Sequence, residues 1–163
     1  MTAPTINWQA KHFDQLTASE LYQALKLRVD VFVVEQTCYY PELDNRDIDS
    51  EVIHLLAYDQ NGKANASGLL PLAAYLRILP PGLCYPGLVA IGRVATDMDY
   101  RGKGLGHPLM QEALRLCQQH WPDFSVKISA QEHLEDFYRK HGFVRVSEMY
   151  LEDGIPHIEM LKD

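Results

Sequence analysis

Apolar and polar residues alternate along the chain in short blocks that predict strands and helices in mixed order. Period-two alternation and β-branched apolar runs predict strands at 6–8, 52–58, 72–79, 89–96, 126–130, 144–150 and 157–161. Apolar residues at helical spacing predict helices after residues 17 and 106 and over 131–141. This order predicts a single α/β domain spanning residues 1–163, in which Met1 to Pro4 form a short loose terminus.

The first predicted helix has a start signal and an apolar face. Thr17 and Glu20 have the spacing of a capping box, in which each side chain bonds the backbone N–H of the other residue. The face expected to be buried comprises Leu21, Leu25, Val29 and Phe32. Arg28 and Asp30 fall between these positions, so we expect them to face a cleft or solvent. The acidic segment 44–51 is expected to be a solvated loop.

The stretch 89–106 carries the clearest chemical signal in the chain. The strand predicted at 89–96 leads to glycines at every second position, Gly102, Gly104 and Gly106, and then to a helix with an apolar face at Leu109, Ala113, Leu116 and Cys117. The first N–H groups of a helix lack partners inside it, and glycines let the backbone approach a bulky anion. With Arg101 and Lys103 beside it, this turn predicts a pyrophosphate site.

The glycine spacing excludes two common nucleotide sites. A P-loop requires a Lys followed by Ser or Thr, whereas Lys103 is followed by Gly104. A dinucleotide fingerprint requires Gly-x-Gly-x-x-Gly, whereas these glycines follow Gly-x-Gly-x-Gly. From the spacing alone, a plain glycine-rich turn with solvated basic residues remains the alternative to an anion site.

Four segments resemble one known family. Arg101-Gly-Lys-Gly-Leu-Gly106, after Ile91-Gly-Arg-Val-Ala-Thr96, is similar to the acetyl-CoA loop of the GCN5-related N-acetyltransferases (GNAT). Segments 27–36, 133–143 and 152–160 resemble the ElaA-type branch of that family. The resemblance extends from about Trp8 to Met160. It implies the GNAT fold, a mixed, mostly antiparallel central sheet flanked by helices, in which two central strands splay apart to hold the cofactor.

The resemblance also assigns cofactor contacts. It implies contacts with acetyl-CoA at Val94, Ala95, Thr96, Arg101, Gly102, Lys103, Gly104, Leu105, Gly106, Gln131 and Tyr138. The backbone N–H of Val94 is the implied oxyanion donor, and the loop amides hold the pyrophosphate. Gln131 stands where many relatives carry Asn, so its role with the pantetheine arm is less defined.

Proton transfer has one implied acid and several candidate bases. The resemblance makes Tyr138 the general acid that protonates the leaving thiolate, although a Tyr on an apolar helix face is also a common core residue. His157 titrates in a range useful for a base, but a lone strand His is more often structural. Glu35 could bind an amine, accept a proton or cap a backbone end, and Glu148 is a further candidate base. If the amine arrives already neutral, no dedicated base is needed.

Charge and cysteine content narrow the classes of function. The net charge of −7 argues against general nucleic-acid binding. Arg93, Arg101 and Lys103 supply local positive charge near the loop, while the acidity elsewhere favours a cationic amine substrate. The three cysteines lack metal-ligand or redox spacing, which predicts reduced thiols in the cytoplasm and no metal. No apolar run is long enough for a membrane span.

These expectations combine into one leading function. The resemblance implies an acetyl-CoA-dependent N-acetyltransferase in which a primary amine, on a small molecule or a peptide, attacks the thioester directly in a ternary complex. The alternative is a noncatalytic acyl-CoA-binding sensor or partner-binding module. The acceptor pocket is expected from loops 36–49, 63–71 and 80–87, of which 63–71 looks like an insertion. A homodimer paired through strands near the C-terminus remains open.

Overall fold

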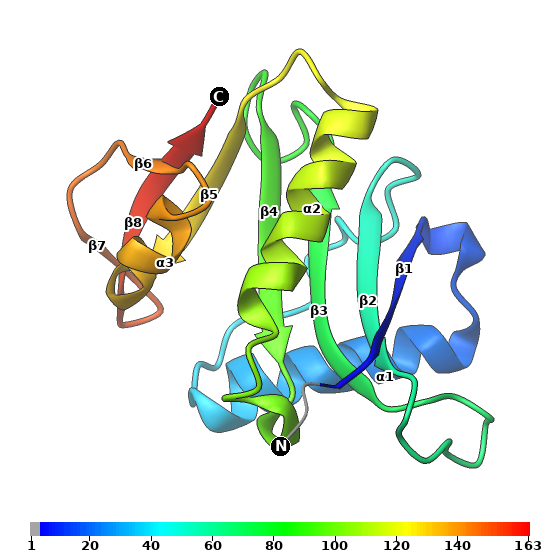
Figure 1. Ribbon diagram of the computed structural model, residues 1–163. Helices are drawn as coiled ribbons and strands as arrows, with labels where there is room; N and C mark the ends of the chain where they lie inside the picture. Colours follow the sequence, from blue (N-terminus) through cyan, green and yellow to red (C-terminus); the bar gives the residue numbers. More distant parts are fainter. Residues whose placement is uncertain (1–3) are drawn as a thin grey trace.

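The computed structural model describes residues 4–163 (Figure 1). Its strands are β1 (Ile6–Lys11), β2 (Ile53–Asp59), β3 (Leu72–Leu79), β4 (Val89–Thr96), β5 (Val126–Gln131), β6 (Val144–Arg145), β7 (Tyr150–Glu152) and β8 (Ile155–Lys162). Its helices are α1 (Ala18–Arg28), the π-helix η2 (Val29–Glu35), α2 (Gly106–His120), α3 (Glu135–Arg139) and the 3-10 turns η1 (Phe13–Gln15), η3 (Met98–Tyr100) and η4 (Glu132–Leu134). The expected loose terminus lies, apart from Pro4, outside the described residues.

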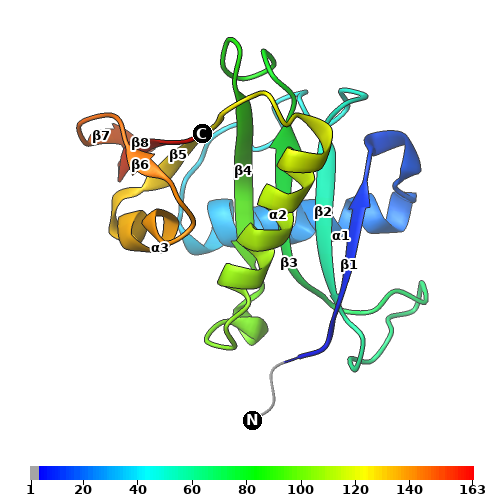
Figure 2. The same ribbon diagram turned by 45° about the horizontal axis from the view of Figure 1, so that its top comes forward.

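The strands form one eight-stranded sheet, ordered β1-β2-β3-β4-β5-β8-β6, with β7 also paired to β8. Neighbouring strands are antiparallel except for β4 and β5, which are parallel. Figures 1 and 2 show α2 on one face of the sheet and α1 on the other. The predicted apolar face of α2, Leu109, Ala113, Leu116 and Cys117, is buried in the larger core cluster. The expected mixed, mostly antiparallel sheet is confirmed.

The strand predicted over 144–150 is wrong in its middle. Only β6 and β7 at its two ends pair with β8, and the chain leaves the ladder after Val146, whose backbone N–H still donates to the Glu159 carbonyl. The hydroxyl of Ser147 accepts a hydrogen bond from the Glu159 backbone N–H at 2.8 Å, which replaces a strand-to-strand bond there. A serine side chain that bonds nearby backbone competes in this way with regular sheet pairing.

The start of α1 is as expected, but its buried face is not. Thr17 accepts from the Glu20 N–H, and the Glu20 carboxylate accepts from the Thr17 N–H, which confirms the capping box. The buried positions are Ala24, Leu27, Arg28 and Val31, whereas Val29 is exposed. Arg28 was expected at a cleft or in solvent because it falls between the predicted apolar positions; it is buried instead, and its ion pairs offset the cost of burying its charge.

Arg28 lies at the centre of a buried ion network, in which three arginines bind three carboxylates. Its Nε and Nη2 donate to Glu42 Oε2 at 3.0 and 2.6 Å, and its Nη1 donates to Asp47 Oδ1 at 2.8 Å. Arg77 donates to the same Asp47 oxygen at 2.9 Å and to both oxygens of Asp44. The network thereby joins α1 and β3 to the loop between η2 and β2.

The predicted solvated loop at 44–51 is therefore wrong for its central acids, since Asp47 is only 6% exposed. Burial disfavours the ionised form of Asp44, but hydrogen bonds and charge from Arg77 outweigh it and hold the pKa of Asp44 below its ordinary 3.8. The stabilisation that Asp44 contributes is accordingly present above that pH and is lost as the pH falls toward the lowered pKa. These carboxylates serve the fold, so they do not form an acidic surface for a cationic substrate.

We predict that Arg28→Met lowers the free energy of unfolding by about 3–5 kcal/mol, because it leaves two buried carboxylates short of a cation. Denaturant unfolding followed by circular dichroism measures the change. The matched control is Arg115→Met, which removes an exposed ion pair to Glu112 on α2 and is expected to leave the midpoint unchanged. Equal unfolding midpoints for both variants would show that the network contributes no net stability.

Candidate active site

The central strands separate where the resemblance places the cofactor. β4 and β5 pair only at Val89–Val126 and Ala90–Lys127, near the start of both strands. Beyond Ala90, β4 continues to Thr96 without pairing to β5, and Figures 1 and 2 show the two strands diverging. Backbone groups on that side of β4 therefore lack a strand partner and can bind an extended ligand arm.

A bulge interrupts β4 beside this opening. Tyr75 faces Ala95 and Arg77 faces Gly92, so Arg93 and Val94 together face a single residue of β3. Arg93 has a φ of +52°, a conformation that costs energy in a residue with a side chain. Its Nε donates to Glu42 Oε2 at 2.7 Å and its Nη2 to the Glu42 carbonyl at 3.1 Å. The buried ion network thus holds the strained residue directly before Val94.

These contacts correct the expected role of Arg93. The sequence suggested that it adds positive charge near the phosphate loop, whereas Glu42 takes up its guanidinium. Sequence reasoning also missed Glu42, which binds both Arg28 and Arg93. No local signal marks this carboxylate, because its partners lie 14 and 51 positions away along the chain.

The glycine loop has the geometry of an anion cradle. Gly102 and Gly104 have φ values of +75° and +76°, which glycine adopts without the Cβ strain of other residues. A Cβ at either position would meet no heavy atom within 4 Å, so space for a ligand lies open there. Leu105 is buried and fixes the loop end, and α2 begins at Gly106. These residues fit a pyrophosphate held by backbone N–H groups at a helix start.

The two cations of the loop point to different neighbours. Arg101 Nη1 donates to Glu35 Oε2 at 2.5 Å, and its Nε donates to the Thr96 carbonyl at 3.2 Å. Lys103 Nζ lies over the Tyr100 ring, 5.0 Å from its centroid. The structure therefore brings Arg101, Thr96 and Glu35 together, three residues that the sequence assigned to the cofactor and acceptor sides of the site.

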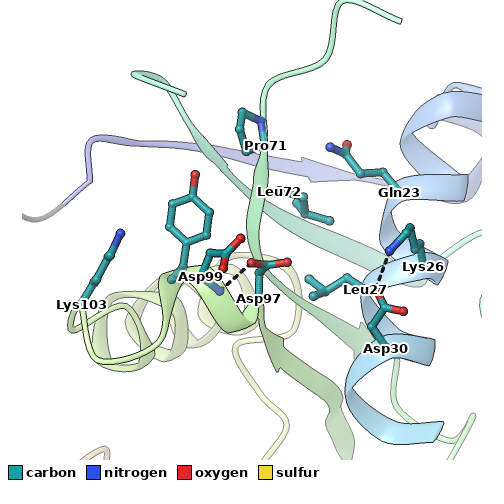
Figure 3. Close-up of a pocket in the computed structure, with 10 residues that line it drawn as sticks. Gln23, Lys26, Leu27, Asp30, Pro71, Leu72, Asp97, Asp99 and Lys103 are labelled. Carbon is teal, nitrogen blue, oxygen red and sulfur yellow. Dashed lines mark hydrogen bonds and ion pairs between the residues drawn. The ribbon is translucent and has the colours of Figure 1, made fainter. Parts of the chain in front are cut away.

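A cavity of about 390 Å³ opens beside the loop, between α1 and the segment after β4 (Figure 3). Lys26 and Asp30 form an ion pair of 2.6 Å on one wall, and Asp97, Asp99 and Lys103 lie on the opposite side. The segment 63–71 adjoins this α1 side, where Gln23 Nε2 donates to the Leu70 carbonyl at 2.9 Å.

The other two expected acceptor loops lie elsewhere. Tyr85, from 80–87, contacts Lys127 of β5, whose amino group lies 4.5 Å from the ring centroid. Cys38, from 36–49, contacts the Asp153 carbonyl at the turn before β8. These contacts of Tyr85 and Cys38 reach the β5–β8 half of the sheet, whereas the acids in the middle of 36–49 bind the arginines of α1, β3 and β4. The segment 63–71 packs along α1.

Tyr138 lies on a helix that is shorter than expected. The region predicted as one helix over 131–141 is β5 ending at Gln131, then η4 and the five-residue α3. Leu134, expected on the apolar face, is 36% exposed.

The Tyr138 side chain packs edge-on against Phe137 and Phe143. Burial raises its pKa to about 12, so the phenol is protonated at neutral pH.

His157 lies on the sheet face opposite Tyr138. Ile158 and Met160 of β8 join the core cluster that contains Tyr138, and alternate strand residues such as His157 face the other way. Its Nδ1 lies 2.7 Å from the Ile155 carbonyl, which makes Nδ1 the donor and leaves the lone pair of a neutral ring on Nε2, 3.3 Å from the Glu152 carboxylate. Its strand partner is Gln131. This position on the face away from Tyr138 suits a structural residue better than a base that works beside Tyr138.

Comparisons with known proteins agree with this geometry. The family model of the acetyltransferase (GNAT) domain matches residues 71–163. An acyl-CoA N-acyltransferase from Pseudomonas aeruginosa is 45% identical, with a TM-score of 0.87 over 98% of this chain and 100% of that chain. Escherichia coli ElaA is 41% identical over 97% of both chains, and its crystal structure has a TM-score of 0.86. A UPF0039 protein of Schizosaccharomyces pombe is 42% identical over 92% of both chains.

The fold and these matches define the class as an acyltransferase of the GNAT fold, a family that uses acyl-CoA. The chain belongs to the GNAT acetyltransferase family and is a homologue of ElaA. None of the helices in residues 4–163 is long and apolar enough to cross a membrane. Across the same part of the chain, no group of three or more His, Cys, Asp or Glu is placed to hold a metal ion.

We predict that Gly104→Glu abolishes acetyl-CoA binding, because its side chain enters the open space of the cradle and repels the pyrophosphate. Isothermal titration calorimetry with acetyl-CoA measures the affinity. Gly68→Glu is the matched control, since Gly68 has a φ of +75° and equally open surroundings but lies in the 63–71 segment. Retained affinity in Gly104→Glu, or an equal loss in both variants, would contradict the loop assignment.

Proposed function

We propose that this protein is an acetyl-CoA-dependent N-acetyltransferase that acts on a primary amine. The observation that carries the proposal is the opening between β4 and β5, which lies on the strand leading to the glycine cradle at the start of α2. One extended ligand with a thioester at one end and a pyrophosphate in its middle fits this arrangement. Acetyl-CoA supplies the activated acetyl group, and the protein supplies position and polarity.

Each proposed catalytic group has a distinct task. The backbone N–H of Val94, beside the bulge, polarises the carbonyl that the amine attacks. Ala95 and Thr96 hold the pantetheine arm by their backbone, and Gln131 contacts it from the end of β5. The Tyr138 hydroxyl donates its proton to the departing thiolate, and burial keeps it protonated for this task.

The amine must lose a proton during transfer. His157, Glu35 and Glu148 are the candidate bases, and the position of His157 on the sheet face opposite Tyr138 favours a carboxylate. Glu35 lies at the end of η2 next to Arg101 and Thr96, whereas Glu148 is exposed in the segment between β6 and β7. We therefore place Glu35 on the acceptor side of the site.

Further parts of the proposal concern the protein as a whole. We infer that residues 1–163 act as one domain in the cytoplasm, without a metal and without nucleic-acid or membrane partners. The net charge of −7 and the three free cysteines support this inference. The proposal is compatible with either a monomer or a homodimer.

The proposed activity is tested by titrating acetyl-CoA into the protein and then measuring free thiol release with a panel of primary amines. We expect binding together with release that depends on the amine. Binding without release from any amine would favour the noncatalytic acyl-CoA sensor. Absence of binding would refute the function and the site together.

We predict that Tyr138→Phe lowers kcat by about 100-fold, the usual scale for a lost general acid, with little change in acetyl-CoA affinity. Thiol-release kinetics and calorimetry measure the two quantities. Tyr58→Phe on β2 is the matched control, because it removes the hydroxyl of another buried tyrosine, and it should leave kcat unchanged. A parallel loss of binding and turnover would make Tyr138 a packing residue.

A further inference from the structure

The ion pair between Glu35 and Arg101 connects the two substrate sides of the site. Glu35 ends η2, and Arg101 follows β4 and η3, 66 positions along the chain. Both side chains are partly exposed to solvent: 39% of the Arg101 side chain and 34% of the Glu35 side chain are accessible. The hydrogen bond from Arg101 to Glu35 raises the pKa of the guanidinium. An incoming anion can therefore reach Arg101, and an incoming cation can reach Glu35.

Arg101 is anchored so that it can exchange partners without leaving its place. Its Nε donates to the Thr96 carbonyl, so the guanidinium stays at the end of β4 when Nη1 is released. The cradle residues Gly102 and Gly104 follow directly in the chain. A pyrophosphate carries more charge than one carboxylate and suits the planar guanidinium fork better, so it can compete with Glu35 for Arg101.

The segment that carries Glu35 is suited to such a change. η2 is a π-helix, a form that is rare and often found at functional sites. Thr37, two residues after Glu35, has a φ of +54°, which is strained for a β-branched residue. Glu35 is therefore the last residue of an irregular helix and is followed closely by the strained Thr37. Val31, earlier in the same helix, is fixed in the core.

We propose that Glu35 binds the ammonium group of the acceptor, and that acyl-CoA makes this carboxylate available by taking Arg101 from it. This inference rests on the proposed function and adds a substrate class and a coupling to it. In the absence of cofactor, Arg101 occupies the carboxylate, so Glu35 is not available to the amine as a counter-charge. With cofactor bound, the freed carboxylate attracts a cationic primary amine to the mouth of the opening between β4 and β5. By linkage, the amine must strengthen cofactor binding by the same factor.

The first test is a double-mutant cycle on coenzyme A affinity, measured by calorimetry. Glu35→Gln removes the competing carboxylate and should tighten binding by up to about fivefold, the scale of an exposed ion pair. Arg101→Ala should weaken binding, and adding Glu35→Gln to it should have no further effect. Glu51→Gln, the loss of an exposed carboxylate elsewhere, is the matched control and should leave the affinity unchanged.

The results of this cycle separate the inference from the function on which it rests. Equal effects of Glu35→Gln and Glu51→Gln would overturn the exchange, as would a gain from Glu35→Gln that persists without Arg101. Failure of the wild-type protein to bind coenzyme A would instead refute the proposed function itself.

The second test uses n-butylammonium as the amine probe, titrated with and without saturating coenzyme A. We expect tighter binding when coenzyme A is present and loss of that gain in Glu35→Gln. We also expect Glu35→Gln to raise the KM for an accepted amine more than it lowers kcat. Equal butylammonium affinity with and without coenzyme A, or no binding in its presence, would overturn the assignment of Glu35.

Discussion

The buried pairing of Arg28 and Arg77 with Glu42 and Asp47 is the interaction on which the rest of the structure depends. Ionised side chains this far from water are tolerated only when each is matched in charge and hydrogen-bonded. Asp47 receives both arginines, and its backbone carbonyl also contacts His54 Nε2 at 3.0 Å. The network therefore fixes α1 and the long loop before β2 against the middle of the sheet, where apolar contacts alone would allow these segments to slide.

The same network reaches the candidate site through Glu42. Arg28 and Arg93 both donate to Glu42 Oε2, and Arg93 is itself a residue of the bulge in β4. Strained backbone persists only where its surroundings overdetermine it, and the two bonds from Arg93 to Glu42 supply that constraint. The orientation of the following N–H, at Val94, is thus coupled to the ion pairs of the fold.

The sequence predicted those parts of the molecule whose signals are local. The strands, the capping box of Thr17 and Glu20, and the glycine turn between β4 and α2 each depend on residues a few positions apart, so their patterns are readable without tertiary information. The network was missed because Glu42 and Arg93 are 51 residues apart and look solvated in isolation. The contact of Glu35 with Arg101 was missed for the same reason, although both residues had been assigned to the site.

The two faces of the sheet divide the tasks of the proposed reaction. Tyr138 packs with the core beneath α2 and α3, where burial keeps its phenol protonated. Glu35 and Arg101 lie in partial contact with water, where a carboxylate can remain charged and exchange partners. The proposed proton donor needs a buried environment, and the proposed cation-binding acid needs a solvated one. A sheet without an opening would keep these two environments separate. In the proposed reaction, the opening of β4 from β5 is the place where both environments act on one acyl group.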